Sequence, residues 1–201
     1  YSTAAIHLPA LLARYHQAYP AVNLQVQAAP SGELLEGVLG HRLDAALVDG
    51  PPSLAGLDGV PLCDEQLVLI TSPEHPAVHS ARDVAGNAVF TFRQGCSYRM
   101  RLEAWYAHAH TPMGRVMEIE SYQSMLACVI AGAGVAMMAQ SMLDSLPGRD
   151  RVRAHRLQAP FDQAVTWLMW RQGMRGANLQ AWIELQQSET INQPSECAVS
   201  A

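Results

Sequence analysis

The chain has 201 residues, enough for one large domain or for two smaller lobes that each bury a hydrophobic core. Hydrophobic residues make up 49% of it and charged residues 15%, which is typical of a globular protein and excludes a disordered or fibrous one. The net charge is −5 and the 13 cationic residues are scattered arginines, so we do not expect this chain itself to bind nucleic acid.

Membrane and metal sites are not expected either. The longest apolar stretch, residues 125–138, is shorter than the roughly 18 residues of a membrane-spanning helix and is broken by two glycines. The cysteines form neither a C-x-x-C pair nor a zinc-finger spacing; they are Cys63, Cys96, Cys128 and Cys197. We therefore expect reduced thiols in a cytoplasmic protein, with no metal or other cofactor and no membrane partner.

The first third of the chain predicts helices that alternate with strands. Thr3 can cap a helix over residues 4–19, which Pro20 ends. Residues 22–28 alternate apolar and polar side chains, which predicts a strand with one buried face. Ser31 is expected to cap the next helix, which carries Glu33 in its first turn. Further strands are predicted at residues 43–48, 60–62 and 66–71.

A new unit starts after Ser72-Pro73. It is predicted to contain strands at residues 88–92, 115–119 and 135–139 and helices at residues 97–109 and 121–131. A strand at residues 163–170 and an amphipathic helix at residues 177–187 follow, before a polar tail.

This order predicts an α/β fold with parallel strands and crossover helices, arranged as two Rossmann-like lobes. We expect lobe I to comprise residues 1–72 and 163–188, lobe II residues 73–162, and the flexible tail residues 189–201. Two lobes joined by two crossings leave a cleft, and clefts between lobes are preferred ligand sites.

Hydroxyl residues begin several predicted helices directly after a strand, at Ser2-Thr3, Ser31-Gly32, Cys96-Ser97-Tyr98 and Ser121-Tyr122. Such turns lie at the carboxyl ends of strands in α/β sheets, where ligands bind. A helix N-terminus offers free N–H groups and a partial positive charge, which suits a carboxylate or phosphate. Serine and threonine are also good caps of any helix, so each position alone is compatible with a purely structural role.

Four motifs occur in order along the chain. They are Leu8-Pro9 with Leu11-Leu12-Ala13-Arg14-Tyr15 and Tyr19-Pro20; Ser31-Gly32-Glu33-Leu34-Leu35 with Leu43-Asp44-Ala45-Ala46-Leu47-Val48; Glu65-Gln66-Leu67-Val68-Leu69-Ile70 with His75-Pro76; and Glu120-Ser121 with Ala131-Gly132-Ala133-Gly134-Val135-Ala136. Through these motifs, residues 1–188 resemble the effector-binding (substrate-binding) domain of LysR-type transcription regulators.

The resemblance implies a type II periplasmic-binding-protein-like fold without enzymatic activity, which binds a small-molecule effector in an inter-lobe cleft. It also implies a homodimer or tetramer that reaches promoter DNA only through an N-terminal winged helix-turn-helix domain, which this chain does not show. The family places a strand just before Tyr1, and the chain does not show that strand either. The effector contacts carried over from the family are Ser2, Thr3, Ser31, Cys96, Ser97, Tyr98, Ser121 and Tyr122.

Three alternatives share this fold or family. A periplasmic solute-binding protein of an ABC transporter would have the same two lobes. A dehydratase on this fold is a second alternative, although no H-E-x-x-H, G-x-S-x-G or phosphate-loop motif is present. A thiol-based redox sensor is the third, because a peroxide-sensing branch of the family has a reactive cysteine in the loop that corresponds to Cys96.

Overall fold

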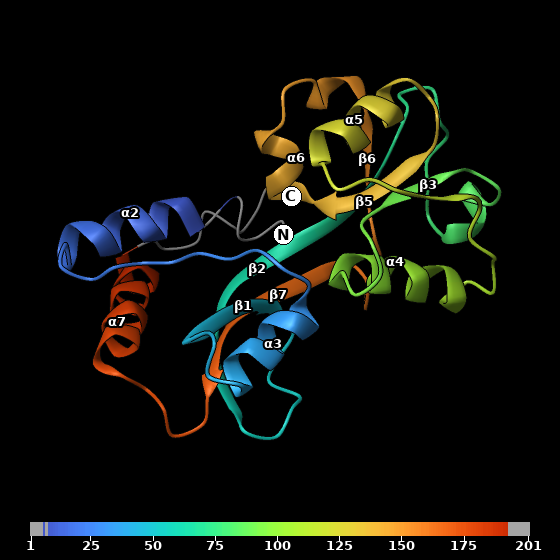
Figure 1. The fold of residues 1–201 in the computed structure, drawn as a ribbon. Coiled ribbons are helices and arrows are strands. Elements are labelled where there is room, and N and C mark those ends of the chain that lie inside the picture. Colours follow the sequence, from blue (N-terminus) through green and yellow to red (C-terminus); the bar gives the residue numbers. More distant parts are fainter. Residues whose placement is uncertain (1–5, 7, 193–201) are drawn as a thin grey trace.

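The computed structural model describes residue 6 and residues 8–192. Their strands form one open, mixed sheet of seven strands, in the order β1-β7-β2-β5-β3-β4, with β6 paired to β2. Helices cover the faces of this sheet (Figure 1). The predicted α/β class is therefore confirmed.

The long strand β2 (Leu57–Thr71) belongs to two parts of the sheet. Its residues 57–66 pair with β7 (Gln163–Arg171), which in turn pairs with β1 (Ala45–Asp49). Both pairings are antiparallel, and we call these strands the antiparallel part.

Residues 67–71 of β2 continue into the second part, which we call the mixed part. There β2 pairs antiparallel with both β5 and β6, while β3 pairs parallel with both β5 and β4. The bounds are Val89–Thr91 for β3, Val116–Glu118 for β4, Val135–Ala139 for β5 and Arg153–Arg156 for β6.

Two helices cover opposite faces of the antiparallel part. Val38 of α3 (Ser31–Leu39) packs in one cluster with Met169 of β7. Ile183 of α7 (Ala177–Asn192) packs with Leu168 and Trp170, whose side chains point to the other face because neighbours alternate along a strand.

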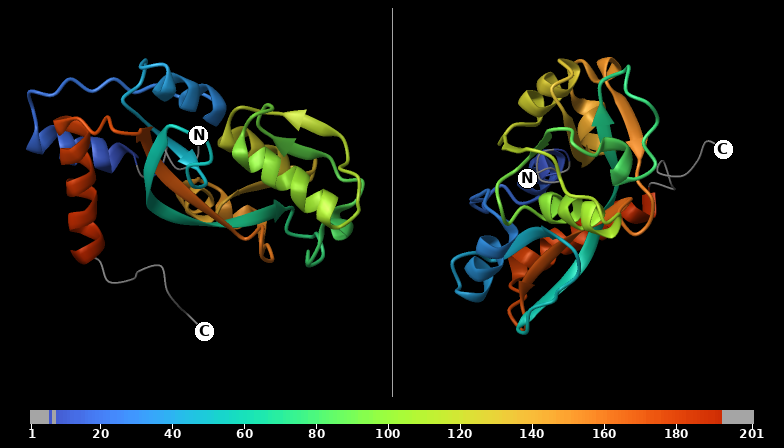
Figure 2. Two further views of the ribbon diagram at one scale, coloured as in Figure 1. Left: turned by 90° about the horizontal axis from the view of Figure 1, so that it is seen from below. Right: turned by 90° about the vertical axis from the view of Figure 1, so that its right-hand side faces the viewer.

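Helix α2 (Leu8–Ala18) packs beside α7 at one end of the molecule (Figures 1 and 2). The Tyr15 hydroxyl donates a hydrogen bond of 2.9 Å to the carbonyl of Asn178, and the Tyr15 and Trp182 rings lie 5.1 Å apart. Tyr15 therefore anchors α2 to α7.

The largest core lies in the mixed part, where the β2 residues Leu67 to Ile70 are fully buried. Leu102 and Leu126 pack against this core from two helices, α4 and α5. Figure 1 shows α4 on one side of these strands and α5 and α6 on the other. The helices of this part are η1 (Ala81–Val84), α4 (Ser97–His108), α5 (Tyr122–Ile130), α6 (Gln140–Ser145) and η2 (Arg149–Arg151).

The predicted strand at residues 22–28 is wrong. They have no strand partner among the residues that the structure describes, and Val26 is 60% exposed. In the described part of the chain, β1 pairs only with β7 and so forms one edge of the sheet. An alternating pattern forms a strand only where a neighbour supplies the hydrogen-bond partners, and none pairs with this segment.

The expectation of parallel strands is also wrong for most of the sheet. Only the two pairings of β3 are parallel among the described strands. Strand β7 returns from the mixed part and inserts between β1 and β2, so it runs against both. The two strands predicted at residues 60–62 and 66–71 are one continuous strand, and α7 extends to Asn192, beyond its predicted end.

His155 of β6 is buried beneath the loop that follows β2. The backbone N–H of Val78 donates to its Nδ1 at 3.2 Å, so Nε2 carries the proton and donates to the Thr71 hydroxyl at 2.9 Å. Burial lowers the pKa of His155, and the positive charge of Arg153 lowers it further. The neutral imidazole therefore fits this site.

This arrangement predicts a pH-dependent stability. As the pH falls below about 6.5, the unfolded chain binds a proton at His155 before the folded chain does, so the free energy of unfolding decreases until the folded-state pKa is reached. Urea denaturation between pH 8 and pH 5 should show this loss, and His155→Gln should remove part of it. His16→Gln, at an exposed position of α2, is the control. An equal pH dependence in wild type and His155→Gln would contradict the prediction.

Candidate functional site

The carboxyl ends of β3 and β4 bring two turns together. The strands are parallel neighbours, and each leads into a helix, β3 into α4 and β4 into α5. Beyond the strands, the Phe92 ring lies edge-on to Tyr122 with centroids 4.8 Å apart, and Arg93 Nε lies 3.5 Å from Glu120 Oε1. The starts of α4 and α5 therefore lie side by side beyond the carboxyl ends of β3 and β4.

Arg99 fixes the turn that leads into α4. Its guanidinium donates to the carbonyl of Phe92 at 3.2 Å, and it pairs with Glu103 at 2.8 Å and Glu118 at 2.5 Å. These carboxylates, Glu103 first, raise the pKa of Arg99 above its ordinary value. Only 8% of the residue is exposed, so it ties the turn to β4 and to the body of α4.

No side chain caps the first turn of α4. Its N-cap residue is Cys96, which makes no side-chain cap hydrogen bond, and the first helical bond runs from Met100 N to the Cys96 carbonyl. The N–H groups of residues 97–99 consequently have no acceptor inside the helix. The Ser97 hydroxyl also has no hydrogen bond within the residues that the structure describes.

The start of α3 has the same form. Its N-cap residue is Pro30, so the predicted capping role of Ser31 is wrong by one position. Ser31 is the first residue of the helix, and its hydroxyl makes no hydrogen bond in the described part of the chain. The first helical bond joins Leu34 N to the Pro30 carbonyl, which leaves the N–H groups of residues 31–33 free.

These two helix starts meet. Gly95 adopts a left-handed conformation with φ of +85°, which a side chain disfavours, and this turns the chain toward α3. A Cβ atom added to Gly95 would lie 3.6 Å from the Cβ of Pro30, so the two residues are close together. Figure 1 shows α3 and α4 next to each other beneath β2. A helix start of the antiparallel part thus faces a helix start of the mixed part.

An ion pair that we did not predict joins the same two parts. Arg101 of α4 donates two hydrogen bonds to the carboxylate of Asp49, at 2.8 and 2.9 Å. Asp49 is the last residue of β1, and a carboxylate at the end of an apolar strand is the only sequence signal that could have drawn attention to it. The hydrogen bonds to Asp49 raise the pKa of Arg101.

The structure places the predicted contact residues in different environments. Ser31, Cys96 and Ser97 are half-buried at the two facing helix starts. Tyr98 and Tyr122 are buried in the core of the mixed part. Ser121 is the N-cap of α5, where its hydroxyl accepts from Ser124 N at 3.3 Å. Ser2 and Thr3 lie outside the described residues.

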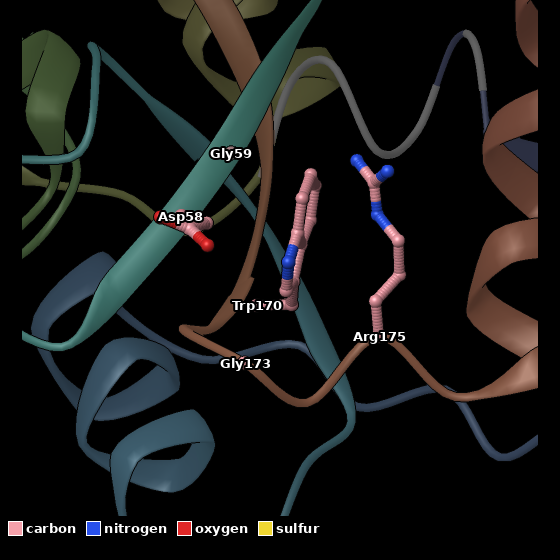
Figure 3. A pocket seen from close by; sticks show the side chains of 5 residues that line it. All are labelled: Asp58, Gly59, Trp170, Gly173 and Arg175. Carbon is pink, nitrogen blue, oxygen red and sulfur yellow. The ribbon is translucent and has the colours of Figure 1, made fainter.

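Two cavities lie away from these turns. One, of about 520 Å³, lies between Asp58 of β2 and Arg175, whose guanidinium lies 4.6 Å from the centre of the Trp170 ring (Figure 3). The other, of about 190 Å³, is lined by His75 and Asn87 and by residues 132–134. It adjoins the amino ends of β3 and β5, whereas α4 starts beyond the carboxyl end of β3. Neither cavity includes a predicted contact residue.

Other kinds of site find no support in the part of the chain that the structure describes. It contains no group of three or more His, Cys, Asp or Glu side chains that could hold a metal ion. No helix among these residues is long and apolar enough to cross a membrane.

Comparison with known proteins identifies the family. Residues 1–190 match the family model of the LysR substrate binding domain. The chain belongs to this family. It is 32% identical over 170 residues to the HTH-type transcriptional regulator GltR of Bacillus subtilis, covering 85% of this chain and 57% of GltR. It is also 32% identical over 150 residues to the regulator CzcR of the same organism, covering 75% of this chain and 51% of CzcR. This LysR domain thus spans about half the length of these relatives.

Solved structures confirm the fold of this LysR domain. The Synechocystis CcmR regulatory domain in complex with 2-PG matches with a TM-score of 0.83 at 19% identity, covering 96% of each chain. The effector-binding domain of QuiR in complex with shikimate matches with a TM-score of 0.77 at 13% identity, covering 96% of this chain and 94% of QuiR. The fold is therefore that of LysR regulatory domains, as the sequence predicted.

The capping hydrogen bond of Ser121 leads to a prediction about stability. Ser121→Ala removes the acceptor of Ser124 N and should lower the free energy of unfolding by about 1 kcal/mol. Ser97→Ala, at the uncapped helix α4, should lower it by much less, because Ser97 has no such hydrogen bond. Urea denaturation of the two variants measures this difference. Equal losses would show that Ser121 does not act as a cap.

Proposed function

We propose that this LysR domain senses an effector, and that it binds a small carboxylate or amino-acid-like metabolite between two lobes. The observation that carries the proposal is the meeting of two uncapped helix starts at Pro30 and Gly95. The N–H groups and hydroxyls of Ser31 and Ser97, which make no hydrogen bond within the described residues, would surround one small anion. Lobe I would comprise residues 1–72 and 163–188, and lobe II residues 73–162.

The relatives support this proposal over a transport receptor. The curated relatives are HTH-type transcriptional regulators, and two of the structural neighbours are complexes with the small molecules 2-PG and shikimate. A shared fold alone does not carry a ligand from one protein to another. The chemistry of the two helix starts in this chain is what makes an anion or a zwitterion the expected ligand.

The proposed mechanism is a shift between two arrangements of the lobes. A ligand that bridges α3 and α4 stabilises the closed arrangement by its differential affinity for it. In the whole regulator, a homodimer or tetramer in the cytoplasm, this shift would change how N-terminal helix-turn-helix domains contact promoter DNA. The domain would act by binding alone, without catalysis.

Substitutions at Ser97 separate the two kinds of donor. Ser97→Pro removes both the N–H group and the hydroxyl, whereas Ser97→Ala removes only the hydroxyl. Proline is tolerated at the first helical position, and Cys96 has the extended backbone (φ −74°, ψ 128°) that a residue before proline needs. Ser97→Pro should therefore keep the fold and weaken effector binding about tenfold or more, and Ser97→Ala should weaken it less.

The ligand for this test comes from a thermal-shift screen of amino acids and small carboxylates, and isothermal titration calorimetry measures its affinity. Arg115→Ala, at an exposed position outside the facing helix starts, is the control. Full affinity in Ser97→Pro and in the equivalent Ser31→Pro variant would refute the proposed site.

A further inference from the structure

The ion pair between Asp49 and Arg101 commits the guanidinium of Arg101 to a carboxylate of the protein. Nε and Nη2 of Arg101 donate to the two oxygens of Asp49, and the side chains are 10% exposed for Asp49 and 26% for Arg101. Two parallel hydrogen bonds between opposite charges form one of the strongest polar contacts in proteins. In this structure Arg101 is therefore already neutralised.

Arg101 belongs to the face of α4 that adjoins the proposed effector site. Residues four apart on a helix lie on the same face, so Arg101 lies one turn behind Ser97. Its partner Asp49 is the last residue of β1. Helix α3 precedes β1 in the chain and packs against it, and the short connection between them reverses the chain direction. The start of α3 and the end of β1 thus lie at the same end of the antiparallel part, facing α4.

The other arginines near the start of α4 are neutralised too. Arg93 pairs with Glu120, and Arg99 pairs with Glu103 and Glu118. With Arg101, three guanidinium groups face four carboxylates in these described ion pairs. One carboxylate of a ligand can bind the N–H groups of Ser31 and Ser97, but a second carboxylate would meet no unpaired arginine of this group.

We propose that Asp49 determines the charge of the effector. By occupying Arg101, its carboxylate makes the site select a ligand with a single carboxylate, such as a zwitterionic amino acid or a monocarboxylate, against dicarboxylates. This inference rests on the proposed effector site. The carboxylate of Asp49 binds Arg101 in the place that a second carboxylate of a ligand would otherwise take.

The test uses ligand pairs of one shape that differ by one carboxylate. Glutamine and glutamate form the first pair, and succinamate and succinate the second. Wild type should bind the amide member of at least one pair more tightly than its dicarboxylate partner. Asp49→Asn keeps the shape of the side chain and frees Arg101, so it should raise the affinity for glutamate or succinate about tenfold or more. Isothermal titration calorimetry measures all four ligands on both proteins.

Two further variants control for loss of charge and for loss of Arg101. Glu103→Gln removes one carboxylate from an ion pair within the mixed part, where Arg99 keeps Glu118, and it should not change the preference. In the double variant Asp49→Asn with Arg101→Gln, no guanidinium is freed, so the gain for dicarboxylates should disappear.

The outcomes separate this inference from the proposed function. A wild type that binds the amide member of neither pair more tightly, or an Asp49→Asn variant that gains no dicarboxylate affinity, overturns the role of Asp49 and leaves effector binding at the helix starts intact. A gain that persists without Arg101 also overturns it. Failure of the proposed function appears elsewhere, as effector binding that Ser97→Pro and Ser31→Pro do not affect.

Discussion

The shared strand β2 is the constraint on which the rest of the structure depends. One strand of 15 residues pairs with β7 along its first part and with β5 and β6 along its second, so both parts of the sheet are fixed to one backbone. The chain returns to the antiparallel part beside it, where Leu67 N donates to the carbonyl of Asp162 at 2.7 Å. The chain passes from the antiparallel to the mixed part near Leu67 and returns near Asp162. These two passages lie next to each other, which sets the position of α3 relative to α4.

A bulge in β2 adapts this strand to its two neighbourhoods. The register with β7 shifts by one residue between Pro61 and Cys63. Proline lacks the N–H that a central strand donates, so its place at an irregularity of the ladder is expected. The sequence predicted separate strands at residues 60–62 and 66–71, whereas the structure has one strand that continues through this bulge. Local pattern alone does not reveal pairing that continues across such a bulge.

Helices α4 and α5 were predictable to within one residue at each end, because each combines a turn, a hydroxyl and apolar residues at helical spacing. The partners of strands were not. Residues 22–28 have the alternation of a strand and yet no strand partner among the described residues, and β7, which begins more than 90 residues after β2 ends, lies between β1 and β2. The candidate site divides in the same way. Ser31 and Ser97 were found from their helix starts, whereas Asp49 and Arg101 meet only through the tertiary fold.

The placement of the hydroxyls relates the helix starts to binding. At α5 the serine is the N-cap itself, and its oxygen is used by the helix. At α3 and α4 the serine comes one residue later, behind Pro30 and Cys96, and both the hydroxyl and the N–H groups of the first turn are left without a partner in the helix. Such groups must be satisfied by water or by a ligand. Helices α3 and α4, which both lack a side-chain cap, begin next to each other where the two parts meet, and the arginines beside α4 are already paired with carboxylates. In the proposed site, recognition by neutral donors, with the charges of the protein balanced among themselves, would therefore favour a ligand of low net charge.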